Sequence, residues 1–173
     1  MPYYRAAVTQ AIKMLGNLDR WLDKAVEYAE KHEMNVDDFV QFRLAPAMYP
    51  LAGQVQAACD GAKFTAARLS GTEAPSHPDE EKTIAELKAR VASTVEYLGS
   101  LTEDQFIDAD SRQITLAFIP GKGATGSDYF HEMAHPNFYF HVVSAYAILR
   151  HNGVDVGKRD FIGSVTLHDL ESE

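Results

Sequence analysis

Residues 136–153 read PNFYFHVVSAYAILRHNG, a run of helical length in whose interior only His141 and Ser144 are clearly polar. Pro136 suits the first position of a helix, and Gly153 suits the residue that ends one. A helix that is apolar on nearly all sides is buried on most of them. We therefore expect this helix either to lie at the centre of a bundle or to be half covered by a second subunit.

Three amphipathic helices are expected to accompany it. In each of them apolar residues recur at steps of three and four, which places those residues along one face. The expected helices cover residues 3–31, residues 35–69, and a stretch that starts between 78 and 83 and ends near 98. Thr83 and Glu86 have the spacing of a capping box at the start of the last of these three.

The second of these helices contains two prolines and is expected to be interrupted. Asn35 is the predicted N-cap, and Gly71 is the predicted stop. Pro46 and Pro50 each remove a backbone donor and crowd the preceding turn. We predict a kink or a break between residues 44 and 51, followed by a regular helix.

The chain changes character after residue 107. Residues 113–119 are β-branched and roughly alternating, which is typical of a short strand, and residues 161–167 are a second candidate strand. The stretch PGKGATGSD at 120–128 is expected to be a loop. The sequence thus predicts an all-α protein, an up-and-down-type four-helix bundle with one or two short strands in its C-terminal half. We expect residues 1–173 to form a single domain.

The composition indicates a cytoplasmic protein. No apolar run approaches the roughly 20 residues that cross a bilayer, and the N-terminus lacks the features of a signal peptide. The chain has a single cysteine, Cys59, so no internal disulfide is available. Its net charge is −9, from 25 acidic and 16 basic residues, and an acidic surface repels phosphate backbones. We expect no nucleic acid partner and no membrane partner.

Residues 131–135 read HEMAH and match the H-E-x-x-H pattern of zinc metalloproteases. That site requires a continuous helix, because the two histidines must face one metal. Pro136 follows directly and disfavours helical backbone at His135, and the glycines in 121–126 indicate a loop upstream. We therefore predict no bound metal; if one binds, its ligands come from His131, His135 and His141.

Four residues are candidates for lining a pocket. His141 lies inside the apolar run, where it is either a core histidine with both nitrogens satisfied or a ligand or acid–base group between helices. Tyr49 lies at the predicted helix break, where a pocket could open, and Arg43 precedes that break. Asn137 begins the last helix beside the same region. Cys59 is expected to be an inert core thiol.

Two segments carry a resemblance to a known family. Residues 136–153, followed by GKRDFIG at 157–163, resemble a bacterial subfamily of the DinB/YfiT-like superfamily, and RLAPAMYPLAGQVQAACD at 43–60 resembles its second helix. The resemblance covers nearly the whole chain. It implies a four-helix bundle, often a homodimer, and membership in a superfamily classed as metalloenzymes.

The resemblance also implies where a metal would bind. DinB-like proteins typically use one histidine on the second helix and an H-x-x-x-H pair on the fourth. Residues 35–70 contain no histidine, and the residue four positions after His141 is Ala145. Two of the three ligands are absent, so we expect no cofactor at the superfamily site, with a divalent metal as the alternative.

Three functions remain open at this point. The first, which we favour, is a homodimeric bundle without metal that binds an unidentified small molecule near His141, Tyr49 and Asn137. The second is a metal- or thiol-dependent transferase or isomerase. The third is a dimeric structural or stress-associated protein without catalysis. The sequence favours a protein that is not an enzyme, because fold alone does not carry activity.

Overall fold

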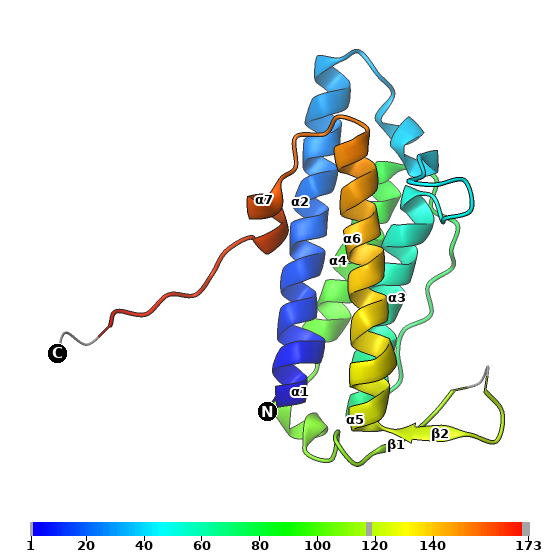
Figure 1. Ribbon diagram of the computed structural model, residues 1–173, viewed down its shortest axis with the longest axis vertical. Helices are drawn as coiled ribbons and strands as arrows, with labels where there is room; N and C mark the ends of the chain where they lie inside the picture. The colour runs from blue at the N-terminus through cyan, green and yellow to red at the C-terminus, as the bar shows by residue number, and fades with distance from the viewer. Residues whose placement is uncertain (1, 117–118, 171–173) are drawn as a thin grey trace.

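Four long helical segments form the body of the molecule (Figure 1). The computed structural model describes residues 2–116 and 119–170. The first segment is continuous and consists of α1 (Pro2–Tyr4), the π-helical η1 (Arg5–Thr9) and α2 (Gln10–Lys31). The second and third are α3 (Leu51–Ser70) and α4 (Ile84–Gly99). The fourth is also continuous and consists of α5 (Gly126–Asp128), the π-helical η4 (Tyr129–Ala134) and α6 (His135–His151).

The shorter elements lie at the ends of the bundle and on its side. They are the 3-10 helices η2 (Val36–Gln41) and η3 (Glu103–Phe106), the strands β1 (Gln113–Thr115) and β2 (Gly123–Thr125), and the helix α7 (Lys158–Ile162). The two strands form an antiparallel hairpin in which Ile114 is opposite Ala124. This structure confirms the predicted all-α fold, a four-helix bundle with short strands in its C-terminal half.

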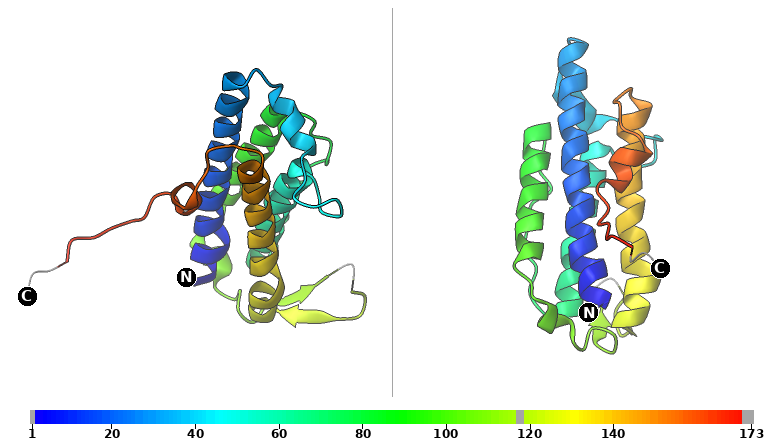
Figure 2. Two further views of the ribbon diagram at one scale, coloured as in Figure 1. Left: turned by 45° about the horizontal axis from the view of Figure 1, so that its top comes forward. Right: turned by 90° about the vertical axis from the view of Figure 1, so that its left-hand side faces the viewer.

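The helices follow the order α2, α4, α3, α6 around the bundle, because each packs mainly against its two neighbours in that order (Figure 2). α3 and α4 run in the same direction: the Ile84 amide donates to Asp37 at one end, and Tyr97 lies within hydrogen-bond distance of Thr72 at the other. Residues 71–83, which we call the crossover, therefore run back along the bundle to connect them (Figure 1).

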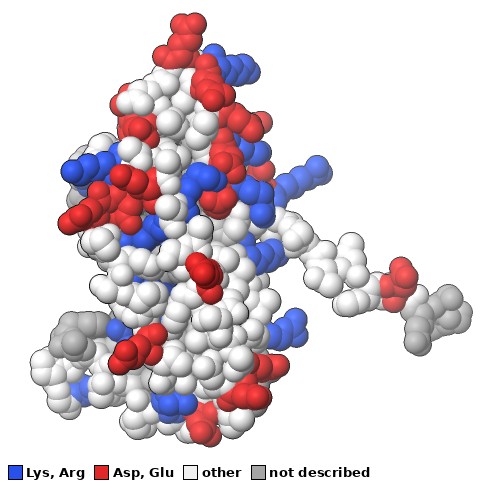
Figure 3. Space-filling model, turned by 180° about the vertical axis from the view of Figure 1, so that it is seen from behind, with Lys and Arg blue, Asp and Glu red and all other residues white. Residues whose placement is uncertain are grey.

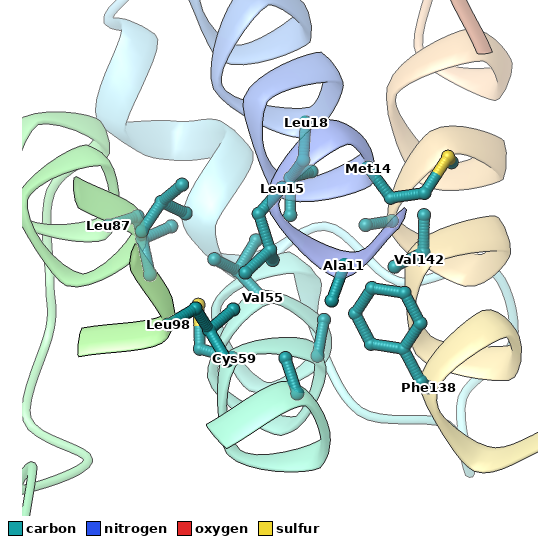
Figure 4. Packing of buried hydrophobic residues seen from close by; sticks show 14 of the residues in the cluster. Ala11, Met14, Leu15, Leu18, Val55, Cys59, Leu87, Leu98, Phe138 and Val142 are labelled. Atoms are coloured by element: carbon teal, nitrogen blue, oxygen red, sulfur yellow. The ribbon is translucent and has the colours of Figure 1, made fainter. Parts of the chain in front are cut away.

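The core lies where the four helices meet, and each contributes its apolar stripe. Figure 4 shows Leu15 and Leu18 of α2 pointing toward residues of the other helices. The labelled partners are Val55 and Cys59 of α3, Leu87 and Leu98 of α4, and Phe138 and Val142 of α6. Apart from Phe138, which is 6% exposed, all of these side chains are at most 2% exposed. The sequence periodicity therefore identified the buried faces correctly.

The predicted helix boundaries are largely confirmed. Asn35 caps η2 by accepting from the Asp37 amide, residues 42–50 form the predicted break, and Gly71 ends α3 with a positive φ of 74°. Thr83 and Glu86 form the predicted capping box, with both reciprocal hydrogen bonds present. These local signals succeeded because each depends on side chains only a few residues apart.

The predicted start of the last helix is wrong. The helix begins at Gly126, ten residues before Pro136, and His135 has helical φ and ψ of −65° and −49°. The reason is the π-helical turn η4, whose i to i+5 hydrogen bonds widen the helix directly before Pro136. A proline ring normally collides with the carbonyl four residues earlier, and the wider turn relieves that collision.

The two strand predictions have different outcomes. β1 covers Gln113–Thr115, the first part of the predicted strand, whereas residues 117–118 of that prediction lie outside the described part of the chain. Its partner β2 lies in the stretch predicted to be a loop. The predicted strand at 161–167 is wrong: Phe161 belongs to α7 and stacks on Trp21, with ring centroids 5.6 Å apart. Asn17 and Trp21 of α2 also donate to the backbone carbonyls of Phe161 and Asp160, so contacts with α2 hold this segment in place of strand pairing.

Charged side chains on the surface are mixed in sign. On the face shown in Figure 3, acidic and basic residues are interspersed. Lys88 on α4 forms ion pairs with Asp19 and Asp23 on α2, at 2.8 and 2.7 Å. None of the described helices combines the length and the apolarity that spanning a membrane requires.

Two buried cations hold the crossover against α3 and α4. The Arg90 side chain is 1% exposed and its guanidinium donates to Asp60 on α3 and to the Glu81 carboxylate and the Pro78 carbonyl on the crossover. The Lys63 side chain is also 1% exposed and pairs with Asp60 at 2.8 Å. A buried charge is costly unless it is paired, so these contacts require the crossover to lie where it does.

The crossover histidine completes this network. The Lys63 ammonium can act only as a hydrogen-bond donor, so it donates to Nδ1 of His77 over 3.0 Å. His77 is therefore neutral, with its proton on Nε2, which lies 3.0 Å from the Ser93 hydroxyl. Burial, followed by the charge of Lys63, lowers the pKa of His77 below its ordinary value.

Replacing Arg90 with methionine should lower the free energy of unfolding by about 3 kcal/mol or more, because three carboxylates, those of Asp60, Asp79 and Glu81, lose their buried partner. Lys88→Met is the matched control: Lys88 joins two carboxylates but is 28% exposed, and its loss should cost about 1 kcal/mol or less. Urea unfolding followed by circular dichroism measures both. Equal losses in the two variants would contradict the role given to Arg90.

Candidate functional site

A groove of about 330 Å³ lies between α3 and α6, and it is the strongest candidate for a functional site. It brings together three of the predicted pocket residues, Tyr49, Asn137 and His141. The remaining lining residues are Ala57, Asp60, Gly61, Phe64, Thr65 and Arg68 on α3, and Tyr129, Met133 and Ala134 on the opposite helix. We call this feature the α3–α6 groove.

The geometry around His141 fixes its tautomer. The amide nitrogen of Gln54 donates to the backbone carbonyl of Tyr49 over 3.2 Å. The amide oxygen of Gln54 therefore faces Nδ1 of His141, at 2.8 Å, and can only accept. His141 must carry its proton on Nδ1. Its other nitrogen, Nε2, is left with a lone pair and has no hydrogen-bond partner among the described residues.

The surroundings of His141 keep the ring neutral. Burial lowers the pKa of His141 below the ordinary value, because the charged imidazolium loses its hydration. The ring of Tyr49 lies nearly parallel to that of His141, with centroids 6.3 Å apart and an angle of 13° between the planes. Tyr49 itself is 61% exposed, so it forms a rim of the groove. This end of the groove therefore offers an uncharged hydrogen-bond acceptor beside an aromatic ring.

The other end of the groove is basic. Arg68 on α3 is half buried and donates to the hydroxyl of Tyr129 over 2.8 Å. Its guanidinium carbon lies 5.3 Å from the centroid of the Phe64 ring and 5.5 Å from that of Tyr129, within the range of cation–π attraction. No described acidic residue forms an ion pair with Arg68. The two rings thus hold the guanidinium in place without neutralising it.

Asp60 also lines the groove, but its charge is engaged. Its carboxylate accepts from Arg90 at 2.7 Å and from Lys63 at 2.8 Å, both on the side of the crossover. Asp60 therefore connects the groove to the buried network described above. Among the described groove residues, the charge that has no partner is that of Arg68.

The structure separates Arg43 from the other candidates. Arg43 lies in the break before α3, and its guanidinium donates to the carbonyl of Met48 within the same segment. It does not line the groove. The sequence reasoning also missed Gln54, Arg68 and Tyr129. Asp60, Phe64 and Arg68 are spaced four residues apart and share one face of α3, and that spacing is the signal that would have found Arg68.

Of the three histidines considered as metal ligands, only His141 lines the α3–α6 groove. His131 is exposed, and His135 packs between Phe130 and Tyr139, with centroids 5.2 and 4.8 Å away. His135 lines a small hollow next to the N-terminal helix, not the α3–α6 groove. Within residues 2–116 and 119–170, no three histidine, cysteine, aspartate or glutamate side chains come together to hold a metal ion.

The residues around His141 do not fit the metal site that the fold implies. The polar side chain facing His141 from α3 is the Gln54 amide, not a second imidazole. Ala145, four residues after His141, has no ligand atom. A catalytic zinc site ordinarily uses three protein ligands. A single imidazole that is already hydrogen-bonded to an amide is a poor match for such a site.

Cys59 lies in the core and not in the groove. It is fully buried, and burial raises the pKa of its thiol to about 12. The thiolate, which is the reactive form, is therefore scarcely populated at neutral pH. The structure thus gives Cys59 a packing role, as the sequence predicted.

Comparisons with known proteins identify the family. A family model described as a domain of unknown function (DUF1993) matches residues 3–162. A crystal structure of a DinB family member from Shewanella denitrificans is 44% identical in sequence, with a TM-score of 0.93, and the match covers 96% of this chain and 95% of that chain. No curated protein matches the sequence. The DinB-like resemblance seen in residues 43–60 and 136–163 is confirmed at the level of the family.

We expect the unfolding free energy to fall as the pH drops from 7.5 to 5.5. The pKa values of His77, His135 and His141 are all lowered in the folded protein. Below about pH 6.5 the histidines of the unfolded chain bind more protons than the same histidines in the folded protein, and this difference favours unfolding. His141→Gln should reduce this pH dependence, as measured by urea unfolding at both pH values.

His168→Gln provides the control for that measurement. His168 is exposed in the segment that follows α7, so its replacement should leave the pH dependence as in the wild-type protein. An unchanged pH dependence in His141→Gln would contradict the buried, neutral state assigned to His141.

Proposed function

This chain belongs to the DUF1993 family, a DinB-like family of unknown function, and we propose that it binds a small organic molecule in the α3–α6 groove. The observation that carries the proposal is the unpartnered Nε2 of His141. Gln54 fixes the ring so that this nitrogen can accept a hydrogen bond from a ligand. Among the described residues Nε2 is not one of the fully buried polar atoms that lack a partner, so it is accessible from the groove, and a ligand there can replace solvent as its hydrogen-bond partner.

The size and lining of the groove support the same proposal. A volume of about 330 Å³ lies at the lower end of the range for small-molecule sites. Such sites combine apolar walls with a few polar groups that fix the orientation of the ligand. Here Phe64 and Met133 supply apolar surface, and Asn137 is exposed with no hydrogen-bond partner among the described residues.

We further propose that this binding needs no metal ion and that the protein is not an enzyme. The position on α3 that faces His141 holds the Gln54 amide, and the position one turn after His141 holds an alanine. The hydrogen bond to Gln54 gives His141 a defined tautomer without a metal. A binding role requires only that acceptor, whereas the metal-dependent alternative requires ligands that the site lacks.

A library of small polar aromatic compounds, screened by ligand-observed NMR, tests the binding function. We expect hits with dissociation constants in the micromolar to millimolar range, unaffected by EDTA. Ala57→Phe fills the groove from α3 and should abolish binding. Ala92→Phe makes the same substitution at an exposed position of α4 and should preserve it.

The outcomes of this screen separate the proposals. Hits that bind Ala57→Phe as well as the wild-type protein would show that they occupy another site. Hits that require added zinc or are lost with EDTA would instead support a metal-dependent role. The absence of any hit would contradict a small-molecule function for the groove.

We also propose that the outer face of α6 forms a homodimer contact. Phe140 and Val143 are 55% and 47% exposed, and residues three apart lie side by side on a helix. Large apolar side chains exposed next to one another are typical of surfaces that pair with another chain. This face is the exposed remainder of the helix that the sequence predicted to be apolar on nearly all sides.

Light scattering coupled to size-exclusion chromatography tests the dimer. The wild-type protein should have twice the mass of the chain, and Phe140→Glu should be monomeric because a buried unpaired carboxylate opposes association. Val165→Glu changes an equally apolar residue that is 63% exposed after α7, and it should remain dimeric. A monomeric wild-type protein would refute the dimer.

A further inference from the structure

The chemistry at the Arg68 end of the groove indicates what kind of molecule binds there. A guanidinium carries five N–H donors in a planar fork. In Arg68, Nη1 donates to the Tyr129 hydroxyl, whereas Nε and Nη2 have no hydrogen-bond partner among the described residues. The Nε–Nη2 edge is one of the two edges on which arginine binds a carboxylate through two parallel hydrogen bonds. That edge is available for a ligand.

The aromatic rings around Arg68 prepare this edge for binding. Phe64 and Tyr129 both lie within cation–π distance of the guanidinium, and the hydroxyl of Tyr129 fixes its rotation. A side chain already held in one orientation loses less conformational entropy when a ligand pairs with it. Arginine at an ordinary surface position has neither restraint. The arrangement around Arg68 is therefore that of a preorganised anion site.

The other carboxylate of the groove does not compete for Arg68. Asp60 lies eight residues earlier on α3, about 12 Å away along the helix axis. Its Oδ1 accepts from both Lys63 and Arg90 on the crossover side. The groove thus has a free cation at one end and, near its other end, the acceptor nitrogen of His141.

We infer that the ligand of the α3–α6 groove is a small monocarboxylate with a flat apolar body, whose carboxylate pairs with the Nε–Nη2 edge of Arg68. This inference rests on the proposed function. Arg68 is the one arginine or lysine among the described residues that line the groove, which matches a single negative charge. Phe64, which is 37% exposed, and Met133 line the groove between its two ends and supply a surface for the apolar body. A hydroxyl or amine at the far end of the ligand would donate to Nε2 of His141.

Two probes of nearly equal shape test the charge requirement. These are 3-phenylpropionate and its neutral amide, 3-phenylpropanamide, titrated into the full-length protein and followed by amide chemical shifts. The carboxylate should bind at least tenfold more tightly than the amide, and added salt should reduce this preference. Arg68→Gln should abolish the preference, and Tyr129→Phe, which keeps the ring but loses the hydroxyl, should reduce it.

Arg150→Gln is the matched control. Arg150 is an exposed arginine on α6 whose nearest carboxylate, Asp155, lies 3.5 Å away, and it does not line the groove. This variant should bind both probes as the wild-type protein does. Circular dichroism and thermal unfolding of each variant verify that the fold is intact, since Arg68 lies at the margin of the core and not within it.

The outcomes distinguish this inference from the proposed function. Equal binding of the carboxylate and the amide, or carboxylate binding that survives Arg68→Gln, overturns the inference while groove binding stands. The inference is also overturned, while groove binding stands, if neither probe binds but other library compounds bind the wild-type protein and fail to bind Ala57→Phe. If no compound binds in the groove, the proposed function fails and the inference fails with it.

Discussion

Two cations, Lys63 and Arg90, are almost entirely withdrawn from water, and each needs a partner to offset its lost hydration. Asp60 on α3 serves both of them, and the crossover supplies the rest through His77, the Pro78 carbonyl, Asp79 and Glu81. This requirement explains why a segment without regular structure lies in a defined place. It also explains how α3 and α4 can run in the same direction although they follow each other in the chain.

The same pairing determines the electrostatics of the groove on the other side of α3. Because Asp60 is committed to Lys63 and Arg90, its charge does not neutralise Arg68. The groove therefore combines a free guanidinium with an imidazole whose tautomer is fixed by Gln54. The bundle thus presents a defined set of polar groups in this groove. One scaffold supports different chemistries because the groups that line its grooves vary independently of its core.

The parts of the fold that follow from short-range patterns were predictable from the sequence. Periodicity identified the helices and their buried faces, and Asn35, Gly71 and Thr83 marked boundaries that the structure confirms. The continuity of the last helix through residue 136 was not predictable, because the rule for proline assumes a regular α-helix.

Only part of the groove was predictable. Tyr49, Asn137 and His141 were recognised from their local setting, but Gln54 faces His141 from 87 residues away in the chain. Arg68 was missed because an arginine in the last turn of a helix ordinarily interacts with the helix dipole and solvent. The pairing of Asp60 with Arg90 links residues thirty positions apart, for which no spacing rule exists.

The π-helical turn at Tyr129–Ala134 has an evolutionary implication. A π turn is equivalent to one extra residue inserted into an α-helix, and each residue of an α-helix turns the chain by about 100°. Loss of one residue here would restore a regular helix, and everything on one side of it would rotate by that angle. Tyr129, which holds Arg68, would then face a different direction from Asn137 and His141. Both ends of the groove would remain intact in sequence but would no longer belong to one site, so relatives that differ by this single residue are expected to differ in what they bind.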